Sequence, residues 1–180
     1  MSELYNIEGW SDNVSGFVTQ AAAGITEPAF EDMGNGLYAH GFTDGEALVV
    51  QHHINHDVKP NGMTHMHVHW SPSTTMTAGD TITWTIDYTI AKGHHQSETF
   101  TAATTRLVLT YTADGTELAH EHMILEHVAG ITTPEVDTLV ISKITYGQGT
   151  YGAKAYGHCM DMHYQVDRNA TPNKVPNFYN

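Results

Sequence analysis

The alternation of apolar and polar side chains over residues 81–90 constrains the fold more than any other feature of the sequence. Successive side chains of a β-strand point to opposite faces, so a repeat of two residues predicts a strand with one buried face. Most of these residues are β-branched or aromatic, which favours strands further. The apolar positions are Ile82, Trp84, Ile86, Tyr88 and Ile90.

Similar patterns recur along the chain, separated by Gly-, Pro-, Asn- and Asp-containing turn signals. Further strands are predicted at residues 47–53, 63–70, 105–112, 118–125, 136–146 and 159–167. Helical periodicity is missing between them, so we expect an all-β fold, an antiparallel β-sandwich that is jelly-roll-like. The expected core comprises Val68, Trp70, Ile82, Trp84, Ile86, Tyr88, Met160, Met162 and Tyr164.

The chain divides into an irregular N-terminal arm, residues 1–36, and a β-sandwich domain, residues 37–180. Gly16, Gly24, Gly34, Gly36 and Pro28 interrupt the arm, and only Ala21–Ala23 suggests a short helix. The arm is expected either to wrap a neighbouring molecule or to cover one edge of the sheet.

The charge balance excludes several partners. Twenty Asp and Glu residues against seven Lys and Arg give a formal charge of −13, which argues against nucleic acid, since phosphate binding needs clustered cations. No apolar run suggests a membrane span, and residues 1–10 lack the pattern of a signal peptide, so we expect synthesis in a cytoplasm. Cys159 is the only cysteine, which rules out an intrachain disulfide.

Histidine is unusually frequent, with fourteen copies. Protonation of all of them would nearly cancel the negative charge, so an assembly of this protein is expected to respond to mildly acidic pH. Their densest run lies in residues 63–70, where strand alternation places His65, His67 and His69 opposite the apolar Met66, Val68 and Trp70. In residues 159–167 the same argument puts Asp161, His163 and Gln165 on one face.

Three interpretations of this histidine face remain open. It is a hydrated surface or a subunit interface formed by His65, His67, His69, Asp161, His163 and Gln165. Alternatively, histidines from several chains, drawn from His65, His67, His69 and His163, bind a divalent metal on an oligomer axis. The third interpretation is a mononuclear catalytic metal within one chain.

The catalytic interpretation has a specific difficulty. His-x-His on a strand resembles the first motif of cupins, which usually carries a Glu a few residues later, but here residues 71–75 contain no acid. Neither His94-His95 nor His120-Glu121-His122 reproduces the second cupin motif. One strand also spaces alternate residues about 6.6 Å apart, which makes it difficult to aim all three at one ion. A cupin-like metal-dependent enzyme is therefore kept as an alternative function, and a glycan-binding module is another.

Several motifs follow one another over residues 37–180. They are the His56-Asp57 loop, the His-Val-His-Trp strand that ends at Trp70, and Trp84-x-x-x-Tyr88. They continue in the segment Asp161-Met-His-Tyr-Gln-Val-Asp167 and in Thr171 and Lys174 of the tail. In these motifs the chain resembles a family of small structural proteins encoded by tailed bacteriophages. One departure is Lys143, which stands where the family pattern leads us to expect an arginine, so a salt bridge at that position is in doubt.

The resemblance implies a non-enzymatic component of a virion: a head-decoration or cement protein, or part of the neck, tail or fibre. Structural modules of phages commonly form trimers, so the expected partners are further copies of the chain and other virion proteins. The expected location is the virion, after synthesis in the cytoplasm of the bacterial host.

Overall fold

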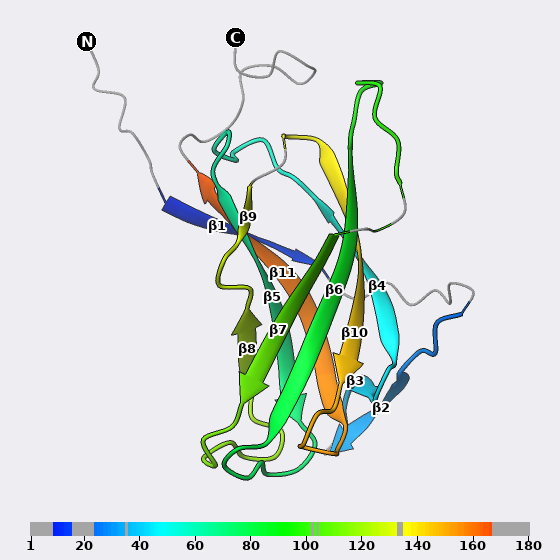
Figure 1. Ribbon diagram of the computed structural model, residues 1–180, viewed down its shortest axis with the longest axis vertical. Helices are drawn as coiled ribbons and strands as arrows, with labels where there is room; N and C mark the ends of the chain where they lie inside the picture. Colours follow the sequence, from blue (N-terminus) through cyan, green and yellow to red (C-terminus); the bar gives the residue numbers. More distant parts are fainter. Residues whose placement is uncertain are drawn as a thin grey trace.

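The computed structural model describes residues 9–15, 24–34, 36–101, 103, 105–132 and 135–166. Within them, eleven β-strands form two antiparallel sheets that pack face to face, which confirms the predicted β-sandwich (Figure 1). This part of the chain contains no helix long and apolar enough to cross a membrane. The strands are β1 (Gly9–Ser15), β2 (Ala29–Gly34), β3 (Leu37–Phe42), β4 (Ala47–His53), β5 (Met63–Pro72), β6 (Thr81–Lys92), β7 (Thr105–Thr112), β8 (Met123–Glu126), β9 (Ile131–Thr132), β10 (Thr138–Gly147) and β11 (Ala155–Val166).

The larger sheet has seven strands and is organised around β11. Its order is β2-β3-β11-β5-β8, with β1 pairing with β11 and β9 pairing with β5. Along one edge β11 pairs first with β3 and then with β1, and along the other it pairs with β5. The last described strand thus joins the N-terminal strands to the histidine-rich one.

The smaller sheet has the order β4-β10-β6-β7. Its register places Asp87 of β6 between Lys143 of β10 and Arg106 of β7. The Lys143 Nζ atom lies 3.3 Å from Asp87 Oδ2. A salt bridge is therefore present at this position, although a lysine stands where an arginine was expected.

The core fills the space between the two sheets. Of the residues predicted for it, Tyr88 is partly buried and the other eight are at most 1% exposed. Phe42 of β3 packs edge-on against Trp84 of β6, with ring centroids 5.0 Å apart, and so links the sheets. The alternation in the sequence therefore located the inner face of each sheet correctly.

Two segments differ from expectation. The N-terminal arm is not wholly irregular, because β1 and β2 lie within it and obtain their hydrogen bonds from β11 and β3. Residues 16–23, with the suggested helix at Ala21–Ala23, lie outside the described part of the chain. The strand predicted at residues 118–125 is shorter, since β8 begins at Met123: His120 has a φ of +64°, which an extended strand does not allow.

Candidate functional site: the histidine face

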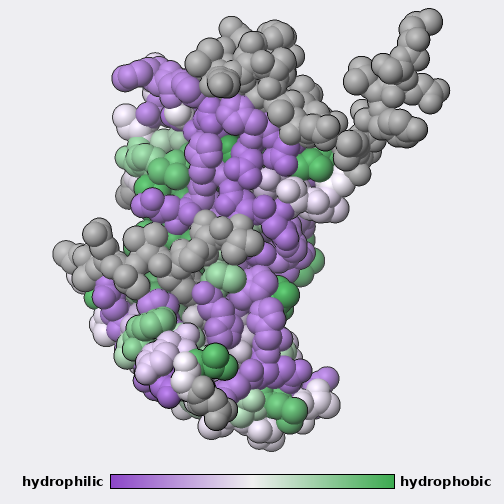
Figure 2. Space-filling model, turned by 180° about the vertical axis from the view of Figure 1, so that it is seen from behind, coloured by the Kyte–Doolittle hydropathy of each residue, from purple (hydrophilic) through white to green (hydrophobic). Residues whose placement is uncertain are grey.

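The outer face of the seven-stranded sheet carries the polar side chains of β5 and β11. The apolar Met66, Val68, Met160 and Met162 are at most 1% exposed on the inner side, so the alternate residues of both strands point outward. In the view opposite to that of Figure 1, a broad hydrophilic band runs over the surface of the molecule (Figure 2). We call the set His65, His67, His69, Asp161, His163 and Gln165 the histidine face.

The register of four neighbouring strands brings two further carboxylates to this face. Asp161 lies directly opposite His67, and on the other side of β5 Glu126 of β8 is also opposite His67. Asp12 of β1 is opposite His163. Neither Asp12 nor Glu126 was predicted from the sequence, because only long-range strand pairing brings them here.

Asp161 lies at the centre of the cluster. Its Oδ1 atom is 3.5 Å from His67 Nδ1, and its Oδ2 atom is 3.2 Å from His69 Nε2 and 3.5 Å from His163 Nε2. His163 Nε2 also contacts Asp12 Oδ1. Three histidines from two strands thus converge on one carboxylate.

His67 is the most enclosed of the three histidines. Its Nε2 atom lies 2.7 Å from Glu126 Oε2, and its ring packs edge-on against that of His163 at a centroid distance of 3.8 Å. The side chains of His67 and Asp161 are only 4% exposed. Even so, both ring nitrogens of His67 and the Oδ1 atom of Asp161 lack a partner with hydrogen-bond geometry.

His65 and Gln165 point away from this centre. The Nδ1 atom of His65 is 3.1 Å from the carbonyl oxygen of His127 and 3.3 Å from Glu126 Oε1. Gln165 Oε1 accepts a hydrogen bond from the Met63 N–H. Of the four histidines proposed as metal ligands, the fold therefore gathers His67, His69 and His163 around Asp161 and places His65 beside them.

Further histidines extend the network along the sheet. His69 Nδ1 lies 2.9 Å from His122 Nε2, and His158 Nε2 lies 2.8 Å from the Ser71 hydroxyl. Burial lowers the pKa of His158, and the nearby His122 and His69 lower it further. Burial also lowers the pKa of His163. Neutral imidazole, the form that binds metals, is thereby favoured at both positions.

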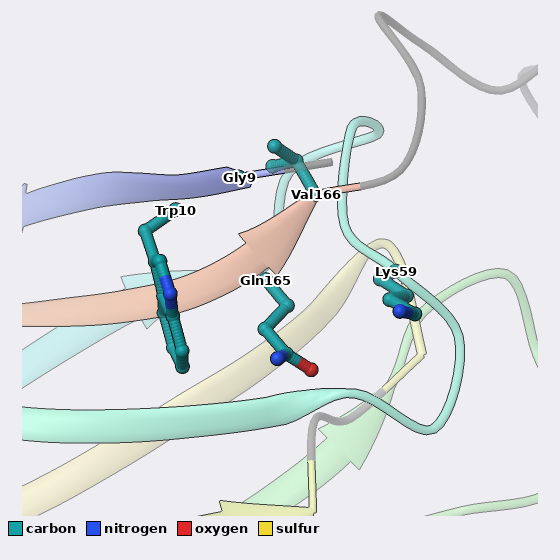
Figure 3. Close-up of a pocket in the computed structure, with 5 residues that line it drawn as sticks. All are labelled: Gly9, Trp10, Lys59, Gln165 and Val166. Atoms are coloured by element: carbon teal, nitrogen blue, oxygen red, sulfur yellow. The ribbon is translucent and has the colours of Figure 1, made fainter. Parts of the chain in front are cut away.

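Beside the histidine face, Gly9, Trp10, Lys59, Gln165 and Val166 line a pocket of about 360 Å³ (Figure 3). Trp10 forms one wall and is 55% exposed, and its indole packs edge-on against the ring of His65. An exposed indole next to an amide and an ammonium group is suited to a sugar or another small polar ligand.

A second histidine cluster surrounds Asp137 at one end of the sandwich. Asp137 Oδ1 lies 3.2 Å from His53 Nε2 and 3.0 Å from His56 Nε2, and its Oδ2 lies 2.7 Å from His94 Nε2. Burial alone would raise the pKa of Asp137, but the hydrogen bond from His94 and the charges of His56 and His53 outweigh it, so this pKa is lowered.

Comparisons with known proteins add little to these observations. No family model and no curated protein matches the chain. Among solved structures, latent PorU from Porphyromonas gingivalis is 10% identical with a TM-score of 0.42, and the match covers 96% of this chain but only 14% of PorU. The Eiger TNF from S. frugiperda is 11% identical with a TM-score of 0.29, and 91% of this chain and 98% of that one are covered.

Proposed function

We propose that this chain is a non-enzymatic structural component of a tailed-phage virion that self-assembles as a homo-oligomer, with a trimer as the favoured form. Two kinds of virion protein fit this role: a decoration or cement protein of the head, and a component of the neck, tail or fibre. The sequence resemblance over residues 37–180 motivates the proposal. The observation that carries the self-assembly is an exposed aromatic surface on the β2–β3 hairpin.

This surface consists of Phe30, Tyr38 and His40. Phe30 and Tyr38 are 64% and 59% exposed, and their rings stack at a centroid distance of 5.8 Å, while the His40 ring lies 5.0 Å from that of Phe30. By strand alternation, Tyr38 and His40 point to the same side of β3 as Phe42, which is fully buried in the core. The hairpin therefore continues the core-facing side of the sheet out to solvent.

A second copy of the chain is the partner that we propose for this surface. Aromatic side chains are enriched at protein interfaces, and ordered rings lose little conformational freedom when they are covered. β2 also ends the seven-stranded sheet in the described part of the chain, so its outer edge offers backbone groups for pairing.

The histidine face supports a structural role over the cupin-like alternative. A catalytic metal keeps an open coordination position for substrate, whereas structural sites are closed by protein ligands. The two central residues, His67 and Asp161, are almost fully covered by their own neighbours, which leaves a substrate little access.

Native mass spectrometry of the purified protein tests the assembly. The wild type is expected to be an oligomer, and the double variant Phe30→Ser with Tyr38→Ser is expected to be a monomer with an unchanged circular dichroism spectrum. Val128→Ser removes an even more exposed apolar side chain, at 84%, from a distant turn and serves as the control. A monomeric wild type would contradict the proposal.

The location in the virion needs a separate experiment. Quantitative mass spectrometry of purified particles of the encoding phage is expected to detect the chain at a fixed copy number that is a multiple of the oligomer size. Its absence from particles that retain their other structural proteins would refute the virion role.

The pocket at Trp10 supports a second function, the binding of host surface glycans by a tail-fibre module. Binding of the wild type to a host polysaccharide, lost in Trp10→Ala and kept in the Phe30 and Tyr38 double variant, would favour it. Failure to bind any polysaccharide of the host would refute it.

A further inference from the structure

We propose that each chain binds one divalent transition-metal ion of the zinc type through His67, His69 and Asp161, and that the adjacent His163 turns toward the ion as the fourth ligand. The site lies within a single chain and so differs from the axial site formed by several chains that the sequence suggested. It does not depend on the virion role or on the oligomeric state.

The spacing of the ligand atoms is the first argument. Zinc bonds of 2.0–2.2 Å in a tetrahedral site place neighbouring ligand atoms about 3.3–3.5 Å apart. Asp161 Oδ1 lies 3.5 Å from His67 Nδ1, and Asp161 Oδ2 lies 3.2 Å from His69 Nε2 and 3.5 Å from His163 Nε2. The candidate ligand atoms of His67, His69 and Asp161 all lie within 4.8 Å of one another, whereas His163 falls within that distance together with Asp161 and Asp12.

The second, independent argument is that several buried polar atoms of the cluster make no hydrogen bond. His67 and Asp161 are each 3% exposed, yet both nitrogens of His67 and Oδ1 of Asp161 have no hydrogen bond. Native proteins rarely leave such groups unpaired, because each loses its hydration without compensation. An ion beside Nδ1 and Oδ1 would satisfy one atom of each residue.

The surrounding groups orient the imidazoles as metal sites require. If His67 binds the ion through Nδ1, its Nε2 faces Glu126 Oε2 at 2.7 Å, and if His69 binds through Nε2, its Nδ1 faces His122 at 2.9 Å. A metal-bound histidine typically directs its other nitrogen to such a partner, which fixes the ring.

The charge of the cluster is the final argument. Asp12, Asp161 and Glu126 bring three carboxylates around these histidines. Among the described residues, the ion pairs of these carboxylates are formed with histidines and not with Lys or Arg. A divalent cation would offset two of the three negative charges. Imidazole nitrogens with one or two carboxylates favour zinc and related metals over magnesium or calcium, which prefer all-oxygen sites.

Metal content and affinity test the proposal. The protein is prepared without a polyhistidine tag, stripped with chelator, titrated with Zn²⁺ and measured by native mass spectrometry and elemental analysis. We expect one ion per chain, whatever the oligomer. Co²⁺ in place of Zn²⁺ should give the intense visible absorption of a tetrahedral site.

The variants distinguish this site from binding to other surface histidines. Loss of an outer hydrogen-bond partner of a metal ligand typically weakens metal binding about 10- to 100-fold. Asp161→Asn keeps the shape of the side chain but removes a ligand, so it should weaken Zn²⁺ binding by more than this. Glu126→Gln should fall within that range. His65→Gln, on the same strand and face, should bind as the wild type does.

Two outcomes would overturn the proposal. One is a metal content well below one ion per chain, including one ion per oligomer. The other is equal affinity of the wild type and Asp161→Asn, which would mean adventitious binding elsewhere. His69→Gln provides a second ligand variant if Asp161→Asn does not fold, and unchanged affinity there would count equally against the site.

Discussion

Asp87 of β6 accepts two hydrogen bonds from the guanidinium group of Arg106 on the neighbouring strand β7. The Nε–Oδ1 distance is 2.6 Å and the Nη2–Oδ2 distance is 2.9 Å. With Lys143 on the other side, a single carboxylate on the outer face of the smaller sheet links three strands. This two-point geometry is the strongest form of the arginine–carboxylate pair.

Replacement of Asp87 with Asn should lower the denaturant midpoint of unfolding at neutral pH, because two cations then face each other without a counter-charge. Hydrogen bonds from Arg106 hold the pKa of Asp87 below its usual range. Its contribution is therefore present above a pH of about 3.9 and is lost as the pH falls below that value. Equal midpoints of the two proteins at neutral pH would contradict the prediction, and Lys143→Met should have a smaller effect.

Glu117→Gln should destabilise the fold by about 1–3 kcal/mol. Glu117 is 3% exposed and accepts hydrogen bonds from the Tyr111 hydroxyl and from the N–H groups of Asp114 and Gly115. Burial alone would raise the pKa of Glu117, but these hydrogen bonds outweigh it and lower the pKa to about 2.

The pH dependence of this loss checks the mechanism. Because the folded-state pKa is lowered, the difference between wild type and Glu117→Gln should be complete above a pH of about 5 and disappear towards pH 2. Urea unfolding at several pH values measures it. The exposed Glu121, which accepts a hydrogen bond from the Leu118 N–H, is the control: Glu121→Gln should change stability by at most about 0.5 kcal/mol.

Asp137→Asn should loosen the segments that carry His53, His56 and His94. The variant removes the negative charge of the carboxylate that the three histidines contact, and it should lower the free energy of unfolding by about 1 kcal/mol. Asn suits the backbone, because Asp137 has a φ of +57°, a conformation that Asn tolerates. Hydrogen exchange should accelerate at residues 53–56 and 93–97 and stay unchanged in β5; uniform acceleration would instead indicate a global loss of stability.

Gly149→Ala should destabilise the protein more than Gly152→Ala. Both glycines have a positive φ, +51° and +67°, so each substitution strains the backbone by about 1–2 kcal/mol. At Gly149 the added methyl group would also overlap the carbonyl oxygen of Thr81, whereas at Gly152 its nearest contact is 3.8 Å away. Similar thermal midpoints for the two variants would show that the close approach to β6 carries no cost.

The sequence predicted those parts of the fold that depend on local alternation. The boundaries of β4 and β7 match the predicted ones, and the buried side of β6 is correct as far as Ile86. β1 was not predicted, because Gly9–Ser15 shows no alternation and forms a strand only through its pairing with β11. The strand partner of these residues lies about 150 positions away in the sequence, so a local sequence pattern cannot reveal the pairing.

The candidate site divides in the same way. Alternation placed His67, His69, Asp161 and His163 on outward faces, which the structure confirms. Their convergence depends on the register between β5 and β11, which sequence periodicity leaves undetermined. His65 points away from the other two histidines, as expected for alternate residues of one strand. His67 and His69 nevertheless both reach Asp161, because the carboxylate lies on the adjacent strand.

The central position of β11 has a consequence for how the chain folds. Because β11 bridges β1 and β3 on one side and β5 on the other, the seven-stranded sheet cannot close before residue 166 has left the ribosome. Contacts this distant in sequence are associated with slow folding, in the range of milliseconds to seconds for β-sandwiches. During synthesis the nascent chain therefore exposes the unpaired edges of β3 and β5, and chaperone occupancy should peak just before β11 emerges.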